Sequence, residues 1–379
     1  MKIAILGTRG VPPAYGGFET FAAELGMRLV KRGHEVTVYC RRDSGFAIQD
    51  SSPSPVSSLE SRVSWNGIQR IELPAIAGKY FETVSHTFLS AIDSLRRGFD
   101  VILLCNAANA FTIPLLRAAR LPVAINVDGI ERRRRKWNVL GQTVYLIGEA
   151  FSASFADRVV ADAEVIAEYY EQHFGVGPAV IPYGSDFPDE NDSDVLQRLG
   201  LERRNYILYV SRFEPENNPL EVVKACEGLS DAPPLVMVGD ARYAIDLKRQ
   251  LLEHRSDRIL FPGALYGPDY RTLQRHALIY IQATEVGGTH PALIEAMRAG
   301  GCVLAHDTPE NREVGGDSIR YFEFRPAETL SQRVRELLAD APCRERMRER
   351  AKLRAGARYS WEAVTEAYEH LFWELAGMA

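Results

Sequence analysis

The residues that most clearly predict chemistry lie in the glycine-rich segment Glu285–Met297, which runs into an expected helix. A proline suits the first helical position because its missing N–H would be unpaired there anyway. The free N–H groups at such a helix start bind phosphate, and glycines let the backbone approach the anion closely. Glu295 lies about one turn further on, where a carboxylate accepts hydrogen bonds from sugar hydroxyls. Phosphate beside hydroxyls is what a nucleotide-sugar presents, so we predict these donor-binding residues: Gly287, Gly288, Thr289, His290 and Glu295.

A second candidate anion site lies near the N-terminus. Gly16 and Gly17 precede a helix expected over about Phe18–Arg32, and the start of that helix offers another set of free N–H groups. Arg9 and Tyr15 are placed in the sequence to line the same pocket. The alternative interpretation is that the two glycines belong to a long turn.

Arg212 follows the first expected strand of the second half of the chain. An arginine can form two parallel hydrogen bonds to a phosphate. The alternative is a surface ion pair with Glu214 or Glu216. We favour phosphate binding, because Arg212 and the segment at Gly287 both follow strands of one expected domain, where open α/β sheets place their ligands.

Three polar side chains of the first half are candidates for handling a second substrate. Asp128 follows the strand expected over Val123–Val127, so its carboxylate can act as a base or orient a hydroxyl, and Glu131 lies close to it in the sequence. Asp162 and Tyr183 would face a cleft between two domains. The alternatives are helix or turn capping for the aspartates and core packing for Tyr183.

The densest run of charge is Arg132–Trp137, with five cations beside a tryptophan. Such a run fits an anionic membrane surface, where each basic side chain contributes about 1 kcal/mol. It equally fits the diphosphate of a lipid-linked acceptor. It is also typical of a solvated helix face, and the sequence leaves these three possibilities open.

The elements that would position these residues form two successive runs of strand–helix alternation, which predicts an α/β protein with two Rossmann-like domains facing an interdomain cleft. We expect the first domain over residues 1–184, a polar linker over 185–204, the second domain over 205–355 and a C-terminal helix over 356–379 that packs back toward the first domain. The expected strands cover 2–6, 35–39, 100–104, 123–127, 158–161, 206–210, 234–238, 258–261, 278–282 and 302–305. Residues 43–64, rich in Ser and Pro, are expected to form a loop.

The length, charge and cysteine content of the chain exclude several classes of protein. The 379 residues suggest two or three domains, and the net charge of -5 argues against a general nucleic-acid binder. The five cysteines are scattered, without a CxxC or Cys/His cluster, so we expect free thiols in a reducing cytoplasm rather than disulfides or zinc. We find no signal peptide and no apolar run long enough to span a membrane.

Taken together, these motifs resemble the retaining, two-domain glycosyltransferases of family 4, which have the GT-B fold. The resemblance runs nearly end to end. It is closest to a subgroup with a characteristic N-terminal domain, represented by bacterial rhamnosyltransferases. The motifs that carry it are Gly7–Pro12, Tyr15–Thr20, Val127–Glu131, Ile181–Gly184, Arg212 with Pro215–Asn218, and Gly287–Pro291 with Glu295–Met297.

The resemblance implies a metal-independent transferase without a cofactor. It places the donor diphosphate on Arg212 and the Gly287–Thr289 backbone, with Asn217 as a further donor-binding residue, and the ribose on Glu295. It places the acceptor in the first domain, with Gly16 and Gly17 near the reacting centre. It implies transfer of a sugar, with L-rhamnose from dTDP-rhamnose as the candidate donor, to a lipid-diphosphate-linked glycan in surface polysaccharide biosynthesis. Such an enzyme would be cytoplasmic, with peripheral contact to the inner face of the membrane.

Two positions depart from the family pattern. The family usually has a glutamate where this chain has Gly287, and a lysine where it has Asn217. Both of the family's groups touch the donor, the first its sugar and the second its diphosphate. Either Glu285 replaces the missing glutamate, or this subgroup recognises the sugar in a different way. For the missing cation at the diphosphate, Arg9 is our candidate.

The sequence is also compatible with two other functions. A GT-B sugar-nucleotide epimerase or hydrolase would form product from the donor alone, and a non-catalytic nucleotide-sugar-binding scaffold would bind the donor without turnover. A Rossmann oxidoreductase is disfavoured, because the segment Gly7–Pro12 does not match the G-x-G-x-x-G fingerprint.

Overall fold

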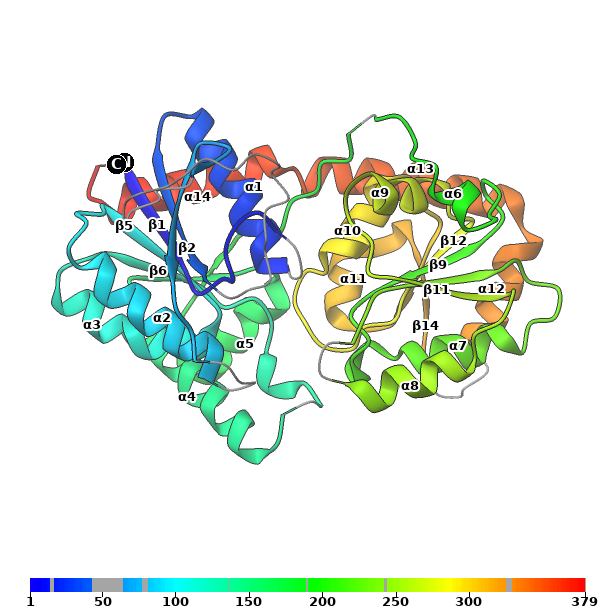
Figure 1. Cartoon of the computed structure of the whole chain (residues 1–379), viewed down its shortest axis with the longest axis horizontal. Coiled ribbons are helices and arrows are strands. Elements are labelled where there is room, and N and C mark those ends of the chain that lie inside the picture. The colour runs from blue at the N-terminus through cyan, green and yellow to red at the C-terminus, as the bar shows by residue number, and fades with distance from the viewer. Residues whose placement is uncertain are drawn as a thin grey trace, which may run out of the picture.

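The protein folds into two α/β domains that lie side by side (Figure 1). The structure is a computed structural model that describes residues 1–13, 17–42, 64–76, 81–135, 137–188, 190–241, 244–324 and 329–378. Each domain has one predominantly parallel sheet with helices on both faces, which confirms the predicted fold class. Within those ranges, no helix combines the length and the apolar composition needed to cross a membrane.

The sheet of the first domain has the strand order β3-β4-β2-β1-β5-β6-β7-β8, and its pairs are parallel except for β3 with β4. Its central strands are nearly continuous runs of buried apolar residues, as expected for parallel strands covered on both faces. The strands span β1 Lys2–Leu6, β2 Glu35–Arg41, β3 Ser64–Trp65, β4 Ile68–Leu73, β5 Val101–Cys105, β6 Val123–Asn126, β7 Arg158–Ala161 and β8 Ala179–Val180.

Helices of the first domain are divided between the two faces of its sheet. Helix α1 packs on one face, together with the C-terminal helix α14 (Trp361–Leu375), while α2, η1, α3 and α5 contribute to the core on the other. Helix α4 packs on η1 and α3 from outside. Their bounds are α1 Gly17–Lys31, α2 Phe81–Ser94, η1 Ala107–Thr112, α3 Ile113–Ala118, η2 Glu131–Arg133, α4 Val139–Phe155 and α5 Glu164–Phe174.

The sheet of the second domain is parallel, with the order β11-β10-β9-β12-β13-β14. Its strands span β9 Ile207–Val210, β10 Leu235–Val238, β11 Ile259–Gly263, β12 Ile279–Gln282, β13 Val303–His306 and β14 Arg320–Phe322. Helices α7, α8 and α12 contribute to the core on one face, and α9, α10, α11 and α13 to that on the other. These elements span α6 Val195–Arg198, η3 Pro215–Asn217, α7 Pro219–Glu227, α8 Ile245–Glu253, α9 Gly267–His276, α10 Pro291–Arg298, α11 Pro309–Gly315, η4 Gly316–Ser318, α12 Thr329–Ala339 and α13 Ala341–Arg358.

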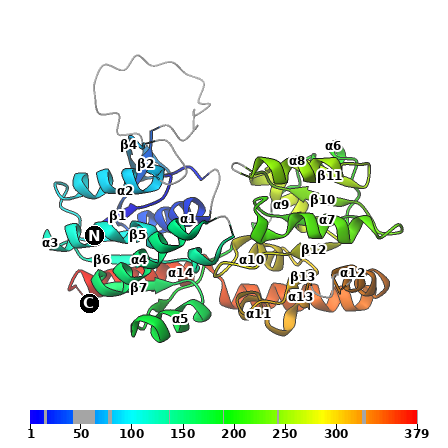
Figure 2. The same cartoon turned by 90° about the horizontal axis from the view of Figure 1, so that it is seen from below.

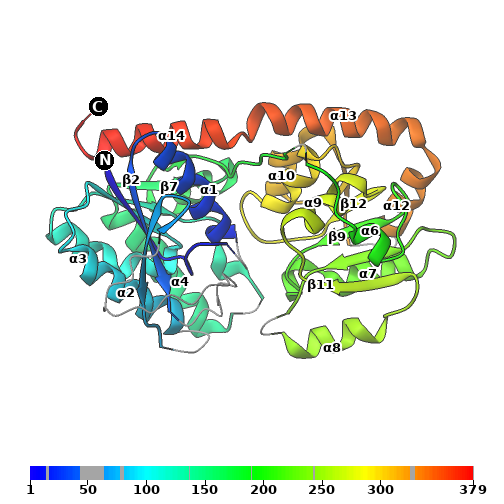
Figure 3. The same cartoon turned by 45° about the horizontal axis from the view of Figure 1, so that its top comes forward.

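The chain crosses between the domains at two places that touch each other. The Ser185 N–H donates to the Tyr359 carbonyl at 2.8 Å. A Cβ at Gly184 would lie 2.6 Å from the ring of Trp361, so only glycine fits against that ring. After this crossing, α14 (Trp361–Leu375) returns to the first domain and packs on α1 (Figures 2 and 3).

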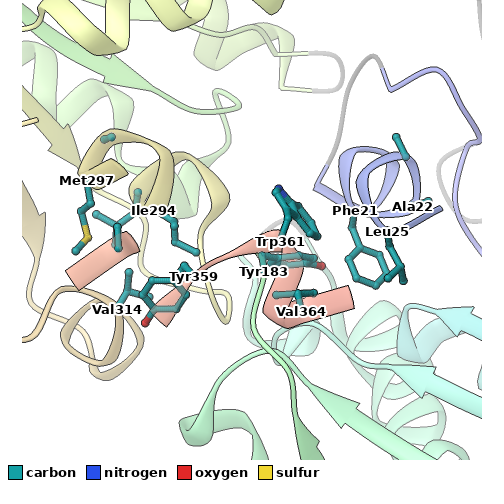
Figure 4. Packing of buried hydrophobic residues seen from close by; sticks show 14 of the residues in the cluster. Phe21, Ala22, Leu25, Tyr183, Ile294, Met297, Val314, Tyr359, Trp361 and Val364 are labelled. Carbon is teal, nitrogen blue, oxygen red and sulfur yellow. The ribbon is translucent and has the colours of Figure 1, made fainter. Parts of the chain in front are cut away.

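One apolar cluster continues through this crossing from domain to domain. On the second domain it includes Ile294, Met297, Val314 and Tyr359, and on the first it includes Phe21, Tyr183, Trp361 and Val364 (Figure 4). Continuous burial across the crossing stabilises the relative placement of the two sheets.

The strands expected from sequence occur within about two residues of their predicted limits. The segment expected as a linker differs from the expectation in one respect. Val195 and Leu196 of α6, together with Leu201, are buried, and α6 packs on α9, so these residues belong to the core of the second domain. Most of the expected serine-rich loop, residues 43–63, lies outside the described residues.

Candidate functional site

A cavity of about 1530 Å³ lies between the domains and is lined by residues of both. In each sheet, the strand order reverses beside the first strand: next to β1 in one domain and next to β9 in the other. Loops that follow β1, β5 and β6 meet loops that follow β9 and β12 around the cavity. Ligands of open α/β sheets bind at such crossover points, so the cavity occupies the expected position for a substrate in both domains at once.

Arg212 lines this cavity directly after β9. Its backbone carbonyl accepts a hydrogen bond from the Asn217 side-chain amide at 2.7 Å, which ties the loop back on itself. Within the described part of the chain, the Arg212 guanidinium makes no hydrogen bond or ion pair, and neither Glu214 nor Glu216 pairs with it. The structure therefore presents a cation to the cavity and uses Asn217 to hold the loop that carries it.

Helix α10 begins at Pro291 with its N-terminus at the cavity, preceded by the glycines 287 and 288. The ring of His290 lies over Gly287 so closely that a Cβ at that position would overlap its Cε1 atom. Burial, together with the charges of Arg134 and Arg212, lowers the pKa of His290 to about 3. His290 is therefore neutral, and the positive character of this wall comes from Arg212 and the N-terminus of α10.

Glu295 lines the cavity one turn into α10. The Tyr270 hydroxyl donates to its carboxylate, and Gln274 in turn donates to the Tyr270 oxygen at 2.9 Å. Burial raises the pKa of Glu295 to about 7 in spite of the hydrogen bond from Tyr270. Its ionisation therefore falls in the neutral range, and a ligand hydroxyl that donates to it favours the charged form.

In the first domain, the cavity wall includes Asp128 and Tyr183, and Asp162 lies directly behind it. Asp128 has a φ of 54°, and the Tyr183 hydroxyl donates to its Oδ1 at 3.3 Å. Burial raises the pKa of Asp128, and the charge of Glu131 raises it further. Burial also raises the pKa of Asp162 well above its usual range, with the charge of Asp128 as the second cause.

The two carboxyl groups lie close enough for each to shift the pKa of the other. Asp162 is fully buried, whereas Asp128 keeps partial exposure at the cavity. Desolvation of the anion is more unfavourable for the more deeply buried partner, so Asp162 is the group that holds the proton. The cavity therefore meets Asp128 as a carboxylate acceptor.

Asp162 also joins the two domains. Its Oδ2 accepts the Thr289 backbone N–H at 2.7 Å, and its carbonyl accepts the Thr289 hydroxyl. A Cβ at Gly288 would overlap Asp162 Oδ1, and a Cβ at Gly129 would lie 2.6 Å from the Gly287 carbonyl carbon. Two glycine-containing loops, one from each domain, thus meet backbone to backbone beside the cavity.

The N-terminal candidates fall partly within the described residues. Gly17 starts α1 and lines the cavity, and a Cβ there would lie 3.8 Å from Pro291 of the opposite domain. The starts of α1 and α10 therefore face each other. Arg9 also lines the cavity, and its backbone N–H donates to Glu19 at 3.0 Å. Tyr15 and Gly16 lie outside the described residues.

The arginine run 132–135 is largely engaged in ion pairs. Arg132 pairs with Glu149 at 3.2 Å, and Arg135 pairs with Glu285 at 2.6 Å. Arg134 is buried between two carboxylates, those of Glu131 at 2.5 Å and Glu216 at 3.4 Å. The run therefore contributes to the domain contact rather than presenting a continuous cationic surface, and Lys136 lies outside the described residues.

The hypothesis that Glu285 replaces the glutamate missing at position 287 is not supported by the geometry. Glu285 pairs with Arg135 and does not belong to the cavity lining. Sequence reasoning also missed the buried Arg134–Glu216 pair between the domains. The only sequence feature that pointed to this pair was the density of arginines at positions 132–135, and that density does not indicate which arginine is buried.

Comparison with known proteins agrees with this geometry. Residues 15–187 match the family model described as Glycosyltransferase Family 4, and residues 193–354 match the model described as Glycosyl transferases group 1. The chain is also 21% identical over 398 residues to the spore coat protein SA of Bacillus subtilis (strain 168), covering 97% of both chains.

Solved structures share the arrangement of the two domains. The sucrose-phosphate synthase of Thermosynechococcus elongatus matches with a TM-score of 0.81 and 18% identity over 100% of both chains. Anabaena Alr3699/HepE, in a complex with UDP-glucose, matches with a TM-score of 0.76 and 17% identity over 98% of this chain and 99% of that one. The fold is therefore GT-B, and together with the two family models it identifies the chain as a glycosyltransferase similar to family 4. The narrower resemblance to rhamnosyltransferases has no counterpart among these matches.

Proposed function

We propose that this glycosyltransferase moves a sugar from a nucleoside-diphosphate donor, held by its second domain, to a hydroxyl of an acceptor held by its first domain. The observation that carries the proposal is the guanidinium of Arg212, which faces the cavity near the N-terminus of α10 without a partner among the described residues. Glu295 lies one turn further along α10. This places a phosphate site beside a hydroxyl site, which matches a nucleoside diphosphate.

In the proposed reaction, the bond between the anomeric carbon and the diphosphate oxygen breaks. The acceptor hydroxyl oxygen bonds to that carbon from the same face, and its proton passes to the departing phosphate oxygen, so the anomeric configuration is retained. Arg212 and the N–H groups of α10 stabilise the charge that develops on the diphosphate. Because these groups supply the positive charge, the proposal includes neither a metal ion nor a cofactor.

On the acceptor side, Asp128 is the proposed positioning group. As a carboxylate at the cavity wall, it accepts the hydrogen bond of the acceptor hydroxyl and fixes its direction. Asp162 and Tyr183 act through Asp128, the first by shifting the pKa of its carboxyl group and the second by donating its phenolic hydrogen at 3.3 Å.

The proposed donor is dTDP-L-rhamnose, and the proposed acceptor is a lipid-diphosphate-linked glycan used in surface polysaccharide biosynthesis at the inner face of the membrane. The motifs shared with bacterial rhamnosyltransferases support this choice. The UDP-glucose complex of Alr3699/HepE supports a nucleotide-sugar in general and makes UDP-glucose the necessary competitor.

Thermal unfolding against a panel of nucleotide-sugars tests the donor. A ligand that binds only the folded state raises the melting temperature, and a concentration 100 times its Kd adds about 2.7 kcal/mol. We expect dTDP-rhamnose to give the largest shift. A larger shift with UDP-glucose would reject rhamnose as the sugar but retain a nucleotide-sugar donor, and the absence of any shift across the panel would reject the donor site.

Transfer itself is tested with Asp128→Asn. Asparagine tolerates the positive φ of this position, so the loop is retained while the charge is lost. We expect transfer to fall by about 100-fold or more with donor binding unchanged, whereas Asp317→Asn, at an exposed site of η4, leaves both unchanged. Unchanged turnover in Asp128→Asn would remove Asp128 from the reaction. Product formed without acceptor would indicate a hydrolase or epimerase, and donor binding without any turnover would indicate a scaffold.

A further inference from the structure

The described residues carry a concentrated apolar surface on two helices of the first domain. Eleven of their seventeen exposed large apolar side chains belong to α2, α4 or the residue that follows α2. On α4 they recur at helical spacing, with Leu140, Val144 and Ile147 on one stripe, and on α2 the residues Phe88 and Ile92 lie one turn apart. An exposed apolar area of this kind marks an interaction site rather than an ordinary solvated surface.

The two stripes border a common element. Helices α2 and α4 both pack against η1, and the ring of Phe88 stacks on that of Phe111 in η1 with centroids 6.5 Å apart. Figure 1 shows α2 and α4 on the side of the first sheet opposite to α14. We call the exposed apolar residues of α2 and α4 the α2–α4 surface.

This surface has an unusual charge distribution. The 17 residues of α4 contain one charged side chain, Glu149, which is buried and paired with Arg132. The carboxylates of α2 are paired as well, Glu82 with Arg41 and Asp93 with Arg97.

Exposed arginines stand at the borders of the surface instead. Arg96 follows α2 and Arg120 follows α3, whereas Arg133, shortly before α4, holds its guanidinium over the ring of Tyr169 in α5. The borders therefore carry positive charge, in a chain whose net charge is -5.

We propose that the α2–α4 surface docks on an anionic lipid membrane. Its apolar side chains would enter the boundary between headgroups and acyl chains, while the bordering arginines contact anionic headgroups. A second copy of the chain fits this surface less well, because a symmetric contact would bring the same arginines near one another without added carboxylates. An anionic membrane offers apolar acyl chains to the centre of the surface and negative headgroups to the arginines at its border.

The surface also leads into the active-site cavity. Phe81 and Val84 at the start of α2, and Leu140 and Val144 at the start of α4, are part of the cavity lining. Docking would therefore place the acceptor side of the cavity at the lipid surface, within reach of a headgroup-linked substrate. This consequence rests on the proposed function, whereas the docking itself can be measured without donor or acceptor.

Co-sedimentation of the full chain with vesicles of phosphatidylcholine, with and without phosphatidylglycerol, tests the docking. We expect binding that strengthens with phosphatidylglycerol. The double variant Val139→Gln/Ile147→Gln changes side chains that are 79% and 51% exposed and do not line the cavity. It should lower the partition coefficient about tenfold or more. The matched control is Ile245→Gln/Leu353→Gln, at side chains 65% and 73% exposed on α8 and α13, which should bind as the wild type does.

Arg96→Gln separates the electrostatic contribution. It should weaken binding about fivefold on vesicles with phosphatidylglycerol and leave binding to phosphatidylcholine alone unchanged. Thermal unfolding of each variant verifies that it is folded, and the nucleotide-sugar shift of each variant reports the donor site independently. Failure of the wild type to bind either vesicle, or an equal loss in the control variant, would overturn the proposal. So would a dimer that Val139→Gln/Ile147→Gln dissociates without any effect on vesicle binding.

Discussion

The backbone N–H of Thr289 donates to the carboxyl group of Asp162 at 2.7 Å, across the boundary between the two domains. The Thr289 hydroxyl adds a second bond, to the Asp162 carbonyl. Asp162 is fully buried, so both bonds are shielded from water. Because Thr289 directly precedes His290 at the start of α10, this contact fixes the phosphate end of the proposed donor site against the proposed acceptor side of the cavity.

Substitution of Asp162 tests whether it is held in its protonated form. Asparagine offers the same acceptor to Thr289 and an N–H in place of the carboxyl proton, so we expect Asp162→Asn to change the unfolding free energy by less than about 1 kcal/mol. Asp162→Ala leaves the Thr289 N–H unpaired and should cost about 1–3 kcal/mol. Chemical denaturation of the two variants measures the difference, and equal destabilisation by both would show that Asp162 is an anion in the fold.

The pH dependence of this comparison has a defined sign. The pKa of Asp162 is raised in the folded state, chiefly by burial, so the folded protein binds more protons than the unfolded one above the ordinary aspartate range. Wild-type stability therefore loses the contribution of Asp162 as pH rises, whereas Asp162→Asn has no such loss. We expect the variant to gain stability relative to wild type between acidic and neutral pH. A difference that stays constant over this range would contradict the assignment.

Arg212→Ala tests the diphosphate site. Loss of a charge-assisted, two-point contact should weaken UDP or dTDP binding about 10- to 100-fold, as measured by calorimetry. Fold stability should hardly change, because the guanidinium makes no bond within the described ranges. Arg135→Ala is the matched control, since Arg135 pairs with Glu285 and does not line the cavity. A similar loss of affinity in both variants would point to a general charge effect.

Arg9→Ala tests the remaining candidate for the cation that the family places at the position of Asn217. Arg9 lines the cavity from the first domain. If it contacts the donor diphosphate, its loss should weaken donor binding about tenfold, because a hydrogen bond to a charged group is worth about 1.5–3 kcal/mol. Unchanged donor affinity in the same calorimetric titration would remove Arg9 from the donor site.

Much of the architecture follows from local sequence patterns. Buried parallel strands such as Val101–Cys105 are short apolar runs between turn signals, and the alternation of strand and helix then fixes two doubly wound sheets. Arg212 and the Gly287 segment were predictable as neighbours because each follows a strand, and β9 and β12 are adjacent in the sheet. The strands β3, β4, β8 and β14, which lie at or next to the sheet edges, were missed because they are short or partly exposed, so they lack a continuous apolar run.

Contacts between the domains could not be predicted from local sequence patterns. Arg134 and Glu216 lie far apart in the sequence, and nothing near either residue predicts that they pair in a buried site. The hydrogen bond from Asn217 to the Arg212 carbonyl likewise depends on the path of the loop. The apolar surface of α4 was overlooked because the neighbouring arginines dominate the sequence, although most of them pair with carboxylates.

Glu295 predicts a pH dependence of donor binding. Its pKa is raised to about 7 by burial, and the carboxylate form is a stronger hydrogen-bond acceptor for a pentose hydroxyl of the nucleotide than the neutral acid. Nucleotide affinity should therefore be constant above neutral pH and fall by up to about tenfold per unit below pH 7. Glu295→Gln should bind more weakly at high pH and lose this dependence. Titrations of both proteins at several pH values provide the measurement, and parallel profiles would exclude Glu295 as the titrating group.

Gly287, which stands where the family has a glutamate, leads to a separate prediction. A Cβ at Gly287 would overlap the His290 ring, so the glycine is required by the histidine and not only by a ligand. Gly287→Ala should displace His290 and distort the start of α10, weakening donor binding about tenfold or more. His290→Ala alone removes the obstructing ring while leaving the α10 N–H groups in place, so its effect should be smaller.

The double variant distinguishes these causes. If the clash with His290 is responsible, Gly287→Ala/His290→Ala should bind the donor better than Gly287→Ala, with a coupling energy within the 0.5–3 kcal/mol found for residues in contact. Additive losses would mean instead that the alanine methyl obstructs the donor directly or strains the contact with Gly129, whose own Cβ would lie 2.6 Å from the Gly287 carbonyl carbon. Gly129→Ala separates these two cases, because it strains the loop contact without adding a group at position 287. A loss of affinity in Gly129→Ala equal to that in Gly287→Ala would assign the effect to the domain contact and remove His290 from the explanation.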